Sequence, residues 1–332
     1  MRDALGGLDT GTLEKIGAAG RAGWREPMLA TLTEQRFSDP SWIFERKLDG
    51  VRAVAARDGG SAKLWSRNHK SIDSGYPELI TALEKRGESR FVADGEIVAF
   101  DGDQTSFARL QSRIHLTDPD RIRHTGVGVY FYLFDLLVVG EYDLTGLPLR
   151  ARKRILRRAF GFDDPLRFSA HRNTDGVELH RQACAKGWEG LIAKRAGSPY
   201  RPGRSTDWLK FKCVRDQEFV VGGFTEPSGS RAGFGALLVG YYDGDDLRYA
   251  GKVGTGYDDE TLRTLRRRLD GLARDSPPFD STSAIRDAHW VRPELVAQIG
   301  FTEWTRDGKL RHPRYQGLRT DKAAGDVVRE TR

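Results

Sequence analysis

The sequence Lys47-Leu48-Asp49-Gly50-Val51-Arg52 constrains the fold most, because it places three charged residues at the junction of two predicted strands. The flanking segments 44–47 and 51–57 have strand-like composition, and the glycine marks a tight turn between them. Lys47 would then end one strand of a hairpin. Two interpretations remain open from these six residues alone. The lysine is either an exposed hairpin residue with a surface ion pair beside it, or a reactive group that projects into a cleft.

Further charged residues recur beside or inside predicted strands along the next 165 residues or so, namely Arg67, Asp94, Glu96, Glu189, Lys194, Lys210 and Lys212. Two acids inside an apolar strand are costly to bury unless they are paired or bind a metal. Two lysines on one face of a strand form a natural anion-binding surface. A satisfied structural pair and a solvated strand face are the simpler interpretations of the same residues.

The combination of one lysine with these acids and bases fits the attack of an amine on a phosphate. A free lysine has a pKa of about 10.4, so it is almost fully charged at neutral pH. A largely neutral amine at pH ~7.4 requires a pKa lowered by about 3 units, or roughly 4 kcal/mol. Burial and neighbouring cations lower a lysine pKa in this way, and carboxylates can hold a divalent metal on the phosphates. The sequence therefore suggests nucleotidyl transfer through Lys47.

Length and charge set the frame for this hypothesis. A chain of 332 residues is too long for one small core and indicates two domains. Its hydrophobic content of 38% is enough to build such cores, so global disorder is not expected. The formal net charge of +7 favours a polyanionic partner such as nucleic acid. A soluble protein that happens to be basic is the alternative.

The two cysteines, Cys184 and Cys213, lack a C-x-x-C spacing, so the sequence indicates neither a zinc site nor a disulfide. Two cysteines without such a pattern fit a reducing cytoplasm. Residues 1–12 contain no apolar signal region. The most apolar run, 129–139, is too short to span a bilayer and is predicted to be a buried strand. We therefore expect a cytoplasmic protein with no membrane partner.

The texture of the sequence changes near residue 215, which predicts a domain boundary there. Residues 26–215 alternate strand-like and helix-like stretches. Residues 216–332 contain about five short strands and one helix, separated by glycine and aspartate turns, and this pattern is typical of a small OB-fold barrel. Residues 1–25 are predicted to be a leader or linker, with a short helix near 13–19.

The charged segments, in this order along the chain, resemble motifs I, Ia, III, IIIa, IV and V of ATP-dependent DNA ligases. Further matching segments are 27–30, 107–111, 233–241, 249–256 and 317–322, the last of which resembles motif VI. They are most similar to the ligase domain of bacterial ligase D proteins, which join DNA ends together with the Ku protein. The resemblance covers residues 26–325. It implies an α+β fold, with a nucleotidyltransferase (ATP-grasp-like adenylation) domain followed by the OB-fold β-barrel domain.

The resemblance also implies a role for each motif residue. Lys47 would be the catalytic nucleophile that becomes adenylated. The residues expected to bind ATP are Glu45 and Phe134 at the adenine, and Arg52, Arg67, Glu96, Lys210 and Lys212 at the ribose and phosphates. Arg204, six residues before Lys210 on a predicted Gly/Pro/Ser loop, is a further phosphate-binding candidate from the sequence itself. The residues expected to hold Mg²⁺ or Mn²⁺ are Glu96 and Glu189. The remaining motif residues are Asp49 in motif I and Arg319, Asp321 and Lys322 in motif VI, whose basic side chains would orient pyrophosphate.

The implied activity is the sealing of 5′-phosphate/3′-hydroxyl breaks in DNA through lysyl-AMP, in double-strand break repair. The expected partners are nicked or broken DNA, Ku, and a separate end-processing polymerase or nuclease, with a nucleoid-associated monomer as the active form. An RNA ligase or capping-type nucleotidyltransferase is the enzymatic alternative. A non-catalytic nucleic-acid-binding module is the alternative from another class.

Two basic clusters and a hinge complete the expectations. The clusters at 150–158 and 263–268 are predicted to lie on amphipathic helices with solvated basic faces, or to contact DNA. The resemblance implies a hinge near 212–217, since the family closes its cleft by moving the second domain.

Overall fold

The computed structural model describes residues 10–114, 116–213, 216–227, 232–280, 285 and 287–330. The chain divides into two compact units, and the first of them ends at Cys213. The predicted boundary near residue 215 falls two positions later, at residues that lie outside the described part, as does the middle of the predicted hinge. The units are therefore described one at a time.

The first unit contains two sheets among its described residues. The larger has the order β1-β9-β8-β6-β4-β5, with β10 beside β8 and β7 beside β6. Its strands are β1 (Gly17–Ala18), β4 (Val51–Asp58), β5 (Lys63–Ser66), β6 (Arg90–Asp101), β7 (Gln104–Thr105), β8 (Val129–Val139), β9 (Tyr142–Asp143) and β10 (Leu166–Phe168). The smaller has the order β11-β3-β12-β13-β2. Its strands are β2 (Met28–Leu32), β3 (Trp42–Lys47), β11 (His171–Asn173), β12 (Gly190–Arg195) and β13 (Gly203–Lys212).

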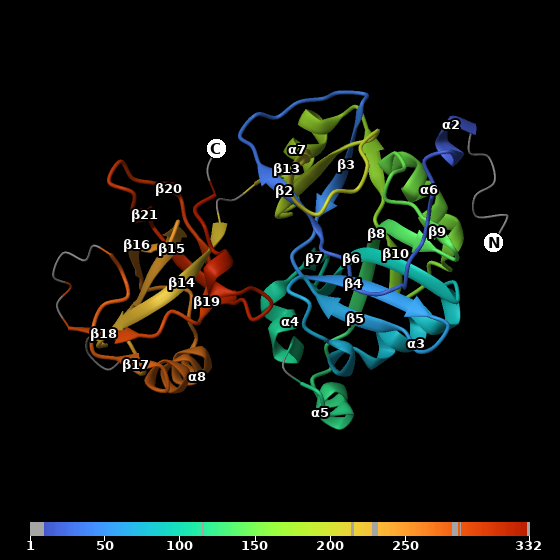
Figure 1. The fold of residues 1–332 in the computed structure, drawn as a ribbon. Helices are drawn as coiled ribbons and strands as arrows, with labels where there is room; N and C mark the ends of the chain where they lie inside the picture. Colours follow the sequence, from blue (N-terminus) through green and yellow to red (C-terminus); the bar gives the residue numbers. More distant parts are fainter. Residues whose placement is uncertain are drawn as a thin grey trace. The chain divides into compact units, whose positions relative to one another are not determined.

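The helices described in this unit are α2 (Thr10–Leu13), η1 (Asp73–Gly75), α3 (Pro77–Arg86), α4 (Phe107–Ile114), α5 (Pro119–His124), α6 (Leu149–Ala159) and α7 (Gly176–Ala185). Helices α3, α4 and α6 pack on the larger sheet and α7 on the smaller one (Figure 1). The predicted helix at 77–85 is confirmed as α3, where a proline occupies the first turn and Leu79 and Leu83 face the core. Helix α5 begins at Asp118, whose carboxylate accepts hydrogen bonds from two backbone amides of the first turn.

Three apolar clusters hold these layers together. The first lies between the larger sheet and α3, α4 and α6. The second lies between the two sheets, where Val54 and Phe134 meet Met28 and Trp208. The third joins the smaller sheet to α7 through Phe44, among other side chains. Each sheet therefore buries both of its faces, and the inner faces confront each other.

The second unit is a curved sheet with one α-helix among its described residues. Its strands are β14 (Asp216–Thr225), β15 (Leu237–Asp243), β16 (Asp246–Val253), β17 (Ala273–Arg274), β18 (Ala288–Val291), β19 (Val296–Gly300), β20 (Glu303–Trp304), β21 (Leu310–Arg311) and β22 (Arg314–Leu318), with α8 (Asp259–Asp270) and the short η2 (Ala324–Asp326). Strand β14 pairs with β15 on one side and with β18 and β19 on the other. A bridge between Thr255 and Arg314 brings the segment after β16 back to β22, so the sheet curls toward closure. None of the described helices is long and apolar enough to cross a membrane.

Two predictions about local structure are wrong. The helix expected near 13–19 ends at Leu13, and Gly17–Ala18 instead pairs with β9, so this part of the expected leader joins the larger sheet. Arg204, expected on a loop, lies in β13. In both cases pairing with a strand distant in sequence decides the conformation, and local composition carries no trace of that partner.

The solvated basic face expected on the 150–158 helix is confirmed for part of the cluster, because α6 exposes Arg150, Arg154, Arg157 and Arg158. Arg152 differs: it is fully buried and pairs with Asp135 of β8, at 2.7 and 2.8 Å from its two carboxylate oxygens. The same guanidinium donates to the carbonyl oxygens of Leu147 and Ser198. A buried charge is tolerated only with such complete pairing. This pair joins α6 to the centre of the larger sheet.

Arg152→Ala should destabilise the protein by about 3–5 kcal/mol, because it leaves the Asp135 carboxylate buried and unpaired. The measurement is urea unfolding. Arg181→Ala is the matched control: Arg181 forms an exposed pair with Glu178 on α7, and its loss should cost less than about 1 kcal/mol. Equal losses in the two variants would contradict the role given to the buried pair.

Candidate active site

Lys47 ends β3, the strand between β11 and β12 in the smaller sheet. Side chains alternate along β3, so Glu45 and Lys47 face the interior between the sheets while Phe44 packs on the α7 side. The ammonium of Lys47 pairs with the carboxylate of Glu189, the residue just before β12. The two side chains are 19% and 13% exposed, so the pair lies at a partly buried position that solvent can still reach.

The two predicted phosphate-binding lysines lie on the same face of the sheet as Lys47. Gly190 of β12 stands opposite Lys47 on one side and opposite Lys212 on the other, and Ile192 stands between Glu45 and Lys210 in the same way. Residues directly opposite each other in a sheet point to the same side. The structure therefore brings together four of the residues singled out in the sequence, and their positive charges outnumber the negative ones.

Glu45, expected at the adenine, is held by two lysines that the sequence did not single out for binding. Its carboxylate accepts hydrogen bonds from Lys153 of α6 at 2.6 Å and from Lys194 of β12 at 2.9 Å. The hydroxyl of Ser169 donates a third, at 3.1 Å. Lys153 follows Arg152 in the basic cluster of α6. Only the apolar spacing of that helix could have indicated that Lys153 faces inward.

The electrostatics of this cluster are dominated by burial and by opposite charges. Burial alone would raise the pKa of Glu45, but the ammonium groups of Lys153 and Lys194 outweigh it and lower that pKa to about 2. Burial lowers the pKa of Lys194 to about 8, in spite of the carboxylate beside it. Glu45 is therefore ionised throughout the neutral range.

Arg52, expected at the ribose or phosphate, pairs with Asp94, and its role at the nucleotide stays a prediction. Its guanidinium donates to both carboxylate oxygens at 2.6 Å, and to the carbonyl oxygen of Met28 at 3.1 Å. The hydroxyl of Tyr200 donates to the same carboxylate at 2.6 Å. Burial alone would lower the pKa of Arg52, but Asp94 outweighs it and raises that pKa. This network ties β4 and β6 of the larger sheet to β2 of the smaller one.

Phe134, expected to stack on a base, is 7% exposed and belongs to the cluster between the sheets. The Lys194 ammonium lies 4.0 Å and the Arg52 guanidinium carbon 4.5 Å from the centre of its ring. Trp208 packs edge-on against it. Cations over an aromatic ring are stabilising, so the ring already has partners, and its role at a base stays a prediction.

The remaining predicted residues of the first unit lie on other strands and turns. Glu96 on β6 stands opposite Arg52 and Tyr132 in the sheet register. Arg67 directly follows β5. Asp49 anchors the turn, since its carboxylate accepts from the amide of Phe107 at 3.0 Å. Arg204 is exposed and donates to the carbonyl oxygen of Ala30 at 2.9 Å.

The predicted motif VI residues belong to the second unit. Arg319 pairs with Asp321 through two hydrogen bonds of 2.9 and 2.7 Å. Lys322 pairs with Glu218 of β14 at 3.1 Å. These pairs fix the segment after β22 to its own unit. The roles expected for them at pyrophosphate stay predictions.

A cavity of about 370 Å³ opens beside the exposed edge of β3, where the pairing with β11 ends. Aromatic rings of Tyr132, Phe168 and Trp188 line it together with the basic side chains Arg46 and His171. No sequence pattern predicts this cavity, because its walls come from four separate segments. Its lining suits a flat ligand that carries negative charge.

Carboxylates at the centre are oxygen ligands of the kind that Mg²⁺ and Mn²⁺ take. Glu189 fits that use by its position beside Lys47, and Glu96 lies on β6 opposite Arg52. Within the described part of the chain, the group of three candidate ligands whose atoms lie within 4.8 Å of one another is His180, Cys184 and Cys213. The predicted metal set therefore stays a prediction for Glu96 and Glu189.

Comparisons with known proteins bear on both units. The family description "ATP dependent DNA ligase domain" matches residues 27–212, and "ATP dependent DNA ligase C terminal region" matches residues 230–322. The "Multifunctional non-homologous end joining protein LigD" of Pseudomonas aeruginosa is 39% identical over 316 residues, which are 92% of this chain and 37% of that protein. Its counterpart in Mycobacterium tuberculosis (strain ATCC 25618 / H37Rv) is 36% identical over 311 residues, 92% of this chain and 40% of that protein.

A solved structure described as "mycobacterial DNA ligase D complexed with ATP and MES" superposes with a TM-score of 0.65 at 33% identity. The match covers 91% of this chain and 97% of that one. The chain spans about two fifths of the length of the curated relatives it matches.

Glu45→Gln should destabilise the protein by about 3–5 kcal/mol near pH ~7, because it leaves two buried ammonium groups without their counter-charge. The pKa of Glu45 is lowered from 4.5 to about 2, so its ionised form stabilises the fold fully above the unfolded value of 4.5. This contribution is lost as the pH falls from 4.5 toward 2. Unfolding free energies measured across that range should show the two proteins converging in acid.

Glu141→Gln, at an exposed position, serves as the control and should change stability by less than about 0.5 kcal/mol. A difference between wild type and Glu45→Gln that stays constant down to the lower pKa would show that the ionised carboxylate is not what stabilises the cluster.

Proposed function

The chain belongs to the family of ATP-dependent DNA ligases, and on that premise we propose that it seals 5′-phosphate/3′-hydroxyl breaks in DNA through an AMP bound to Lys47. That membership confirms the expected fold class, an α+β adenylation domain followed by an OB-fold domain. The observation that carries the proposal is the shared sheet face. Lys47 lies there with Lys210 and Lys212, and with Glu189 at its ammonium.

In the first step Lys47 releases a proton to solvent, its neutral Nζ atom bonds to the α-phosphorus of ATP, and the bond to the leaving pyrophosphate breaks. Lys210 and Lys212 contribute by charge, since neighbouring cations disfavour the ammonium form of Lys47 and attract phosphate. The AMP then passes to the 5′-phosphate at the break. The 3′-hydroxyl attacks that activated phosphate, and AMP leaves. Positioning and electrostatics supply most of the rate in such transfers.

The metal is part of the same proposal. Glu189, with Glu96, is proposed to hold Mg²⁺ or Mn²⁺, which would supply Lewis-acid stabilisation of the phosphate charge. Glu189 also pairs with the ammonium of Lys47, which holds the end of that side chain in place. Arg67 at the phosphates, and Arg319, Asp321 and Lys322 at pyrophosphate, are proposed on the family resemblance, and Arg204 at the phosphates on its position in the sequence.

The biological setting is proposed from the relatives. Those from P. aeruginosa and M. tuberculosis are named as multifunctional non-homologous end joining proteins. We extend to this chain a role in double-strand break repair at the nucleoid, as a monomer, with Ku and separate end-processing enzymes as partners. The support is the similarity over 92% of the chain.

Lys47→Ala should abolish adenylation while binding of nicked DNA is retained, because the variant removes the nucleophile and no other motif residue. Intact mass after incubation with ATP and Mg²⁺ is the measurement, and a gain of one AMP in the wild type should map to Lys47. Lys63→Ala is the matched control, since Lys63 is an exposed lysine on β5 of the larger sheet. It should label as the wild type does.

Four outcomes would overturn the proposal or redirect it. AMP retained on Lys47→Ala would move the nucleophile elsewhere. Labelling by GTP in place of ATP would favour a capping-type enzyme, and sealing of nicked RNA but not nicked DNA would favour an RNA ligase. A wild-type protein that binds DNA but never labels would be a non-catalytic binding module.

A further inference from the structure

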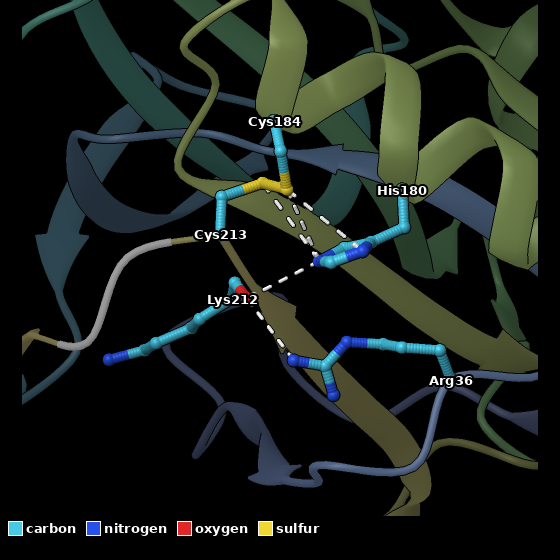
Figure 2. Close-up of a disulfide and its surroundings, with 5 residues drawn as sticks. All are labelled: Arg36, His180, Cys184, Lys212 and Cys213. Carbon is cyan, nitrogen blue, oxygen red and sulfur yellow. Dashed lines mark hydrogen bonds between the residues drawn. A yellow bond between two sulfur atoms is a disulfide. The ribbon is translucent and has the colours of Figure 1, made fainter. Parts of the chain in front are cut away.

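Cys184 and Cys213 form a disulfide, contrary to the prediction from their spacing. Cys184 lies near the end of α7 and Cys213 directly follows β13 (Figure 2). Their Cα atoms are 5.2 Å apart although 29 positions separate them in the sequence. Spacing alone failed here because β12 and β13 run antiparallel and return the chain to α7.

The crosslink is joined to the candidate active site by short backbone connections. The amide of Cys213 donates to the carbonyl oxygen of Glu189 at 3.0 Å. Cys213 follows Lys212 directly, and the segment between the two cysteines contains Glu189 and Lys210 as well. Cys213 is also the residue at which the first unit ends. The disulfide therefore fixes to α7 the strand end that presents the anion-binding lysines.

His180 lies one turn before Cys184 on α7 and touches both sulfurs. Its Nε2 atom is 3.5 Å from the Cys184 sulfur and 3.9 Å from the Cys213 sulfur, and 3.3 Å from the carbonyl oxygen of Lys212 (Figure 2). Arg36 donates to the same carbonyl oxygen at 3.2 Å. Burial lowers the pKa of His180, which favours a neutral imidazole near pH ~7. Because Nε2 donates to the carbonyl oxygen of Lys212, the nitrogen that can accept a thiol proton is Nδ1, 3.9 Å from the Cys184 sulfur.

We propose that Cys184 and Cys213 are a reversible thiol–disulfide site, with His180 as its proton acceptor, that positions Lys210 and Lys212 for adenylation of Lys47. The effect on adenylation rests on the proposed function. An enzyme that acts on chromosomal DNA works where thiols are kept reduced, and disulfides found in such compartments are mostly catalytic or redox-sensing. A fixed structural crosslink would not persist there.

The exchange balances with small thiols as co-reactants. In reduction, a dithiol attacks one sulfur of the pair and then closes to its own disulfide, leaving two cysteine thiols and carrying away the electron pair. In oxidation, His180 takes the proton of a cysteine thiol, and the thiolate attacks an external disulfide. The second cysteine then attacks the sulfur of the first cysteine in this mixed disulfide, so that two external thiols have left in total. The same three side chains could bind a soft metal only after reduction, because bonded sulfurs offer no thiolate.

Reduction changes one restraint on the strand end and leaves the others. The pairing of Lys212 with Gly190 and the hydrogen bonds from Arg36 and His180 do not depend on the sulfur bond. The expected result is a more mobile strand end with its lysines slightly displaced. A displacement of ~1 Å in a positioned group can cost up to about 100-fold in rate, so we expect adenylation to slow by roughly tenfold.

The experiment compares the full chain equilibrated with oxidised or with reduced dithiothreitol. Thiol titration should find neither cysteine reactive after oxidation and both cysteines reactive after reduction. Single-turnover adenylation at saturating ATP should be about tenfold faster in the oxidised wild type. Cys184→Ser should show one rate in both buffers, equal to that of the reduced wild type. His180→Ala should re-form the disulfide more slowly and reach the same final thiol count.

Two results would overturn the proposal: thiols that stay reactive in the oxidising buffer, or equal adenylation rates in the two states of the wild type. Hydrogen exchange of the peptide 206–213, which needs no catalysis, separates this proposal from the proposed function. If neither state adenylates, the proposed function fails. Faster exchange on reduction, absent in Cys184→Ser, would then still support the thiol–disulfide site, and unchanged exchange would refute it.

Discussion

The buried carboxylate of Glu45 is the interaction on which the candidate active site depends. It binds a lysine from α6 and a lysine from β12, and so holds β3 between the helix and the neighbouring strand. Two residues further along the same strand, Lys47 leaves the buried region and meets Glu189. Lys47 is therefore held by an anchored strand, so its backbone has little conformational freedom to lose when ATP binds.

A second polar network holds the two sheets together. Arg52, Asp94 and Tyr200 connect β4 and β6 to β2 through charge-assisted hydrogen bonds. Such networks are stabilising only when every member is satisfied, and here the carboxylate is satisfied by two donors from different segments. The residues expected at the ribose and the adenine thus also tie elements of the first unit together.

Much of this could be predicted from the sequence, and the failures share one cause. That Lys210 and Lys212 share one face of a strand followed from alternation, which is a local property. That this face also carries Lys47 depends on the pairing of β3 with β12 and of β12 with β13. The partners of Glu45, the burial of Arg152 and the disulfide depend on which distant elements pack together. Composition shows that α6 is basic, but only the packing of α6 on β8 tells which of its cations point inward.

The low pKa of Lys194 has a consequence for the pH range in which the protein works. With Glu45 ionised and both lysines charged, the cluster carries one net positive charge, and the pKa of Lys194 is about 8. Its positive charge therefore fades in weakly alkaline solution, beside the face where an anion is expected. Binding of a polyanion there would draw a fraction of a proton from the buffer. Lys194, which helps to hold β3 in place, would thus take up protons when a polyanion binds. This uptake would be measured as a heat of binding that changes with the ionisation enthalpy of the buffer.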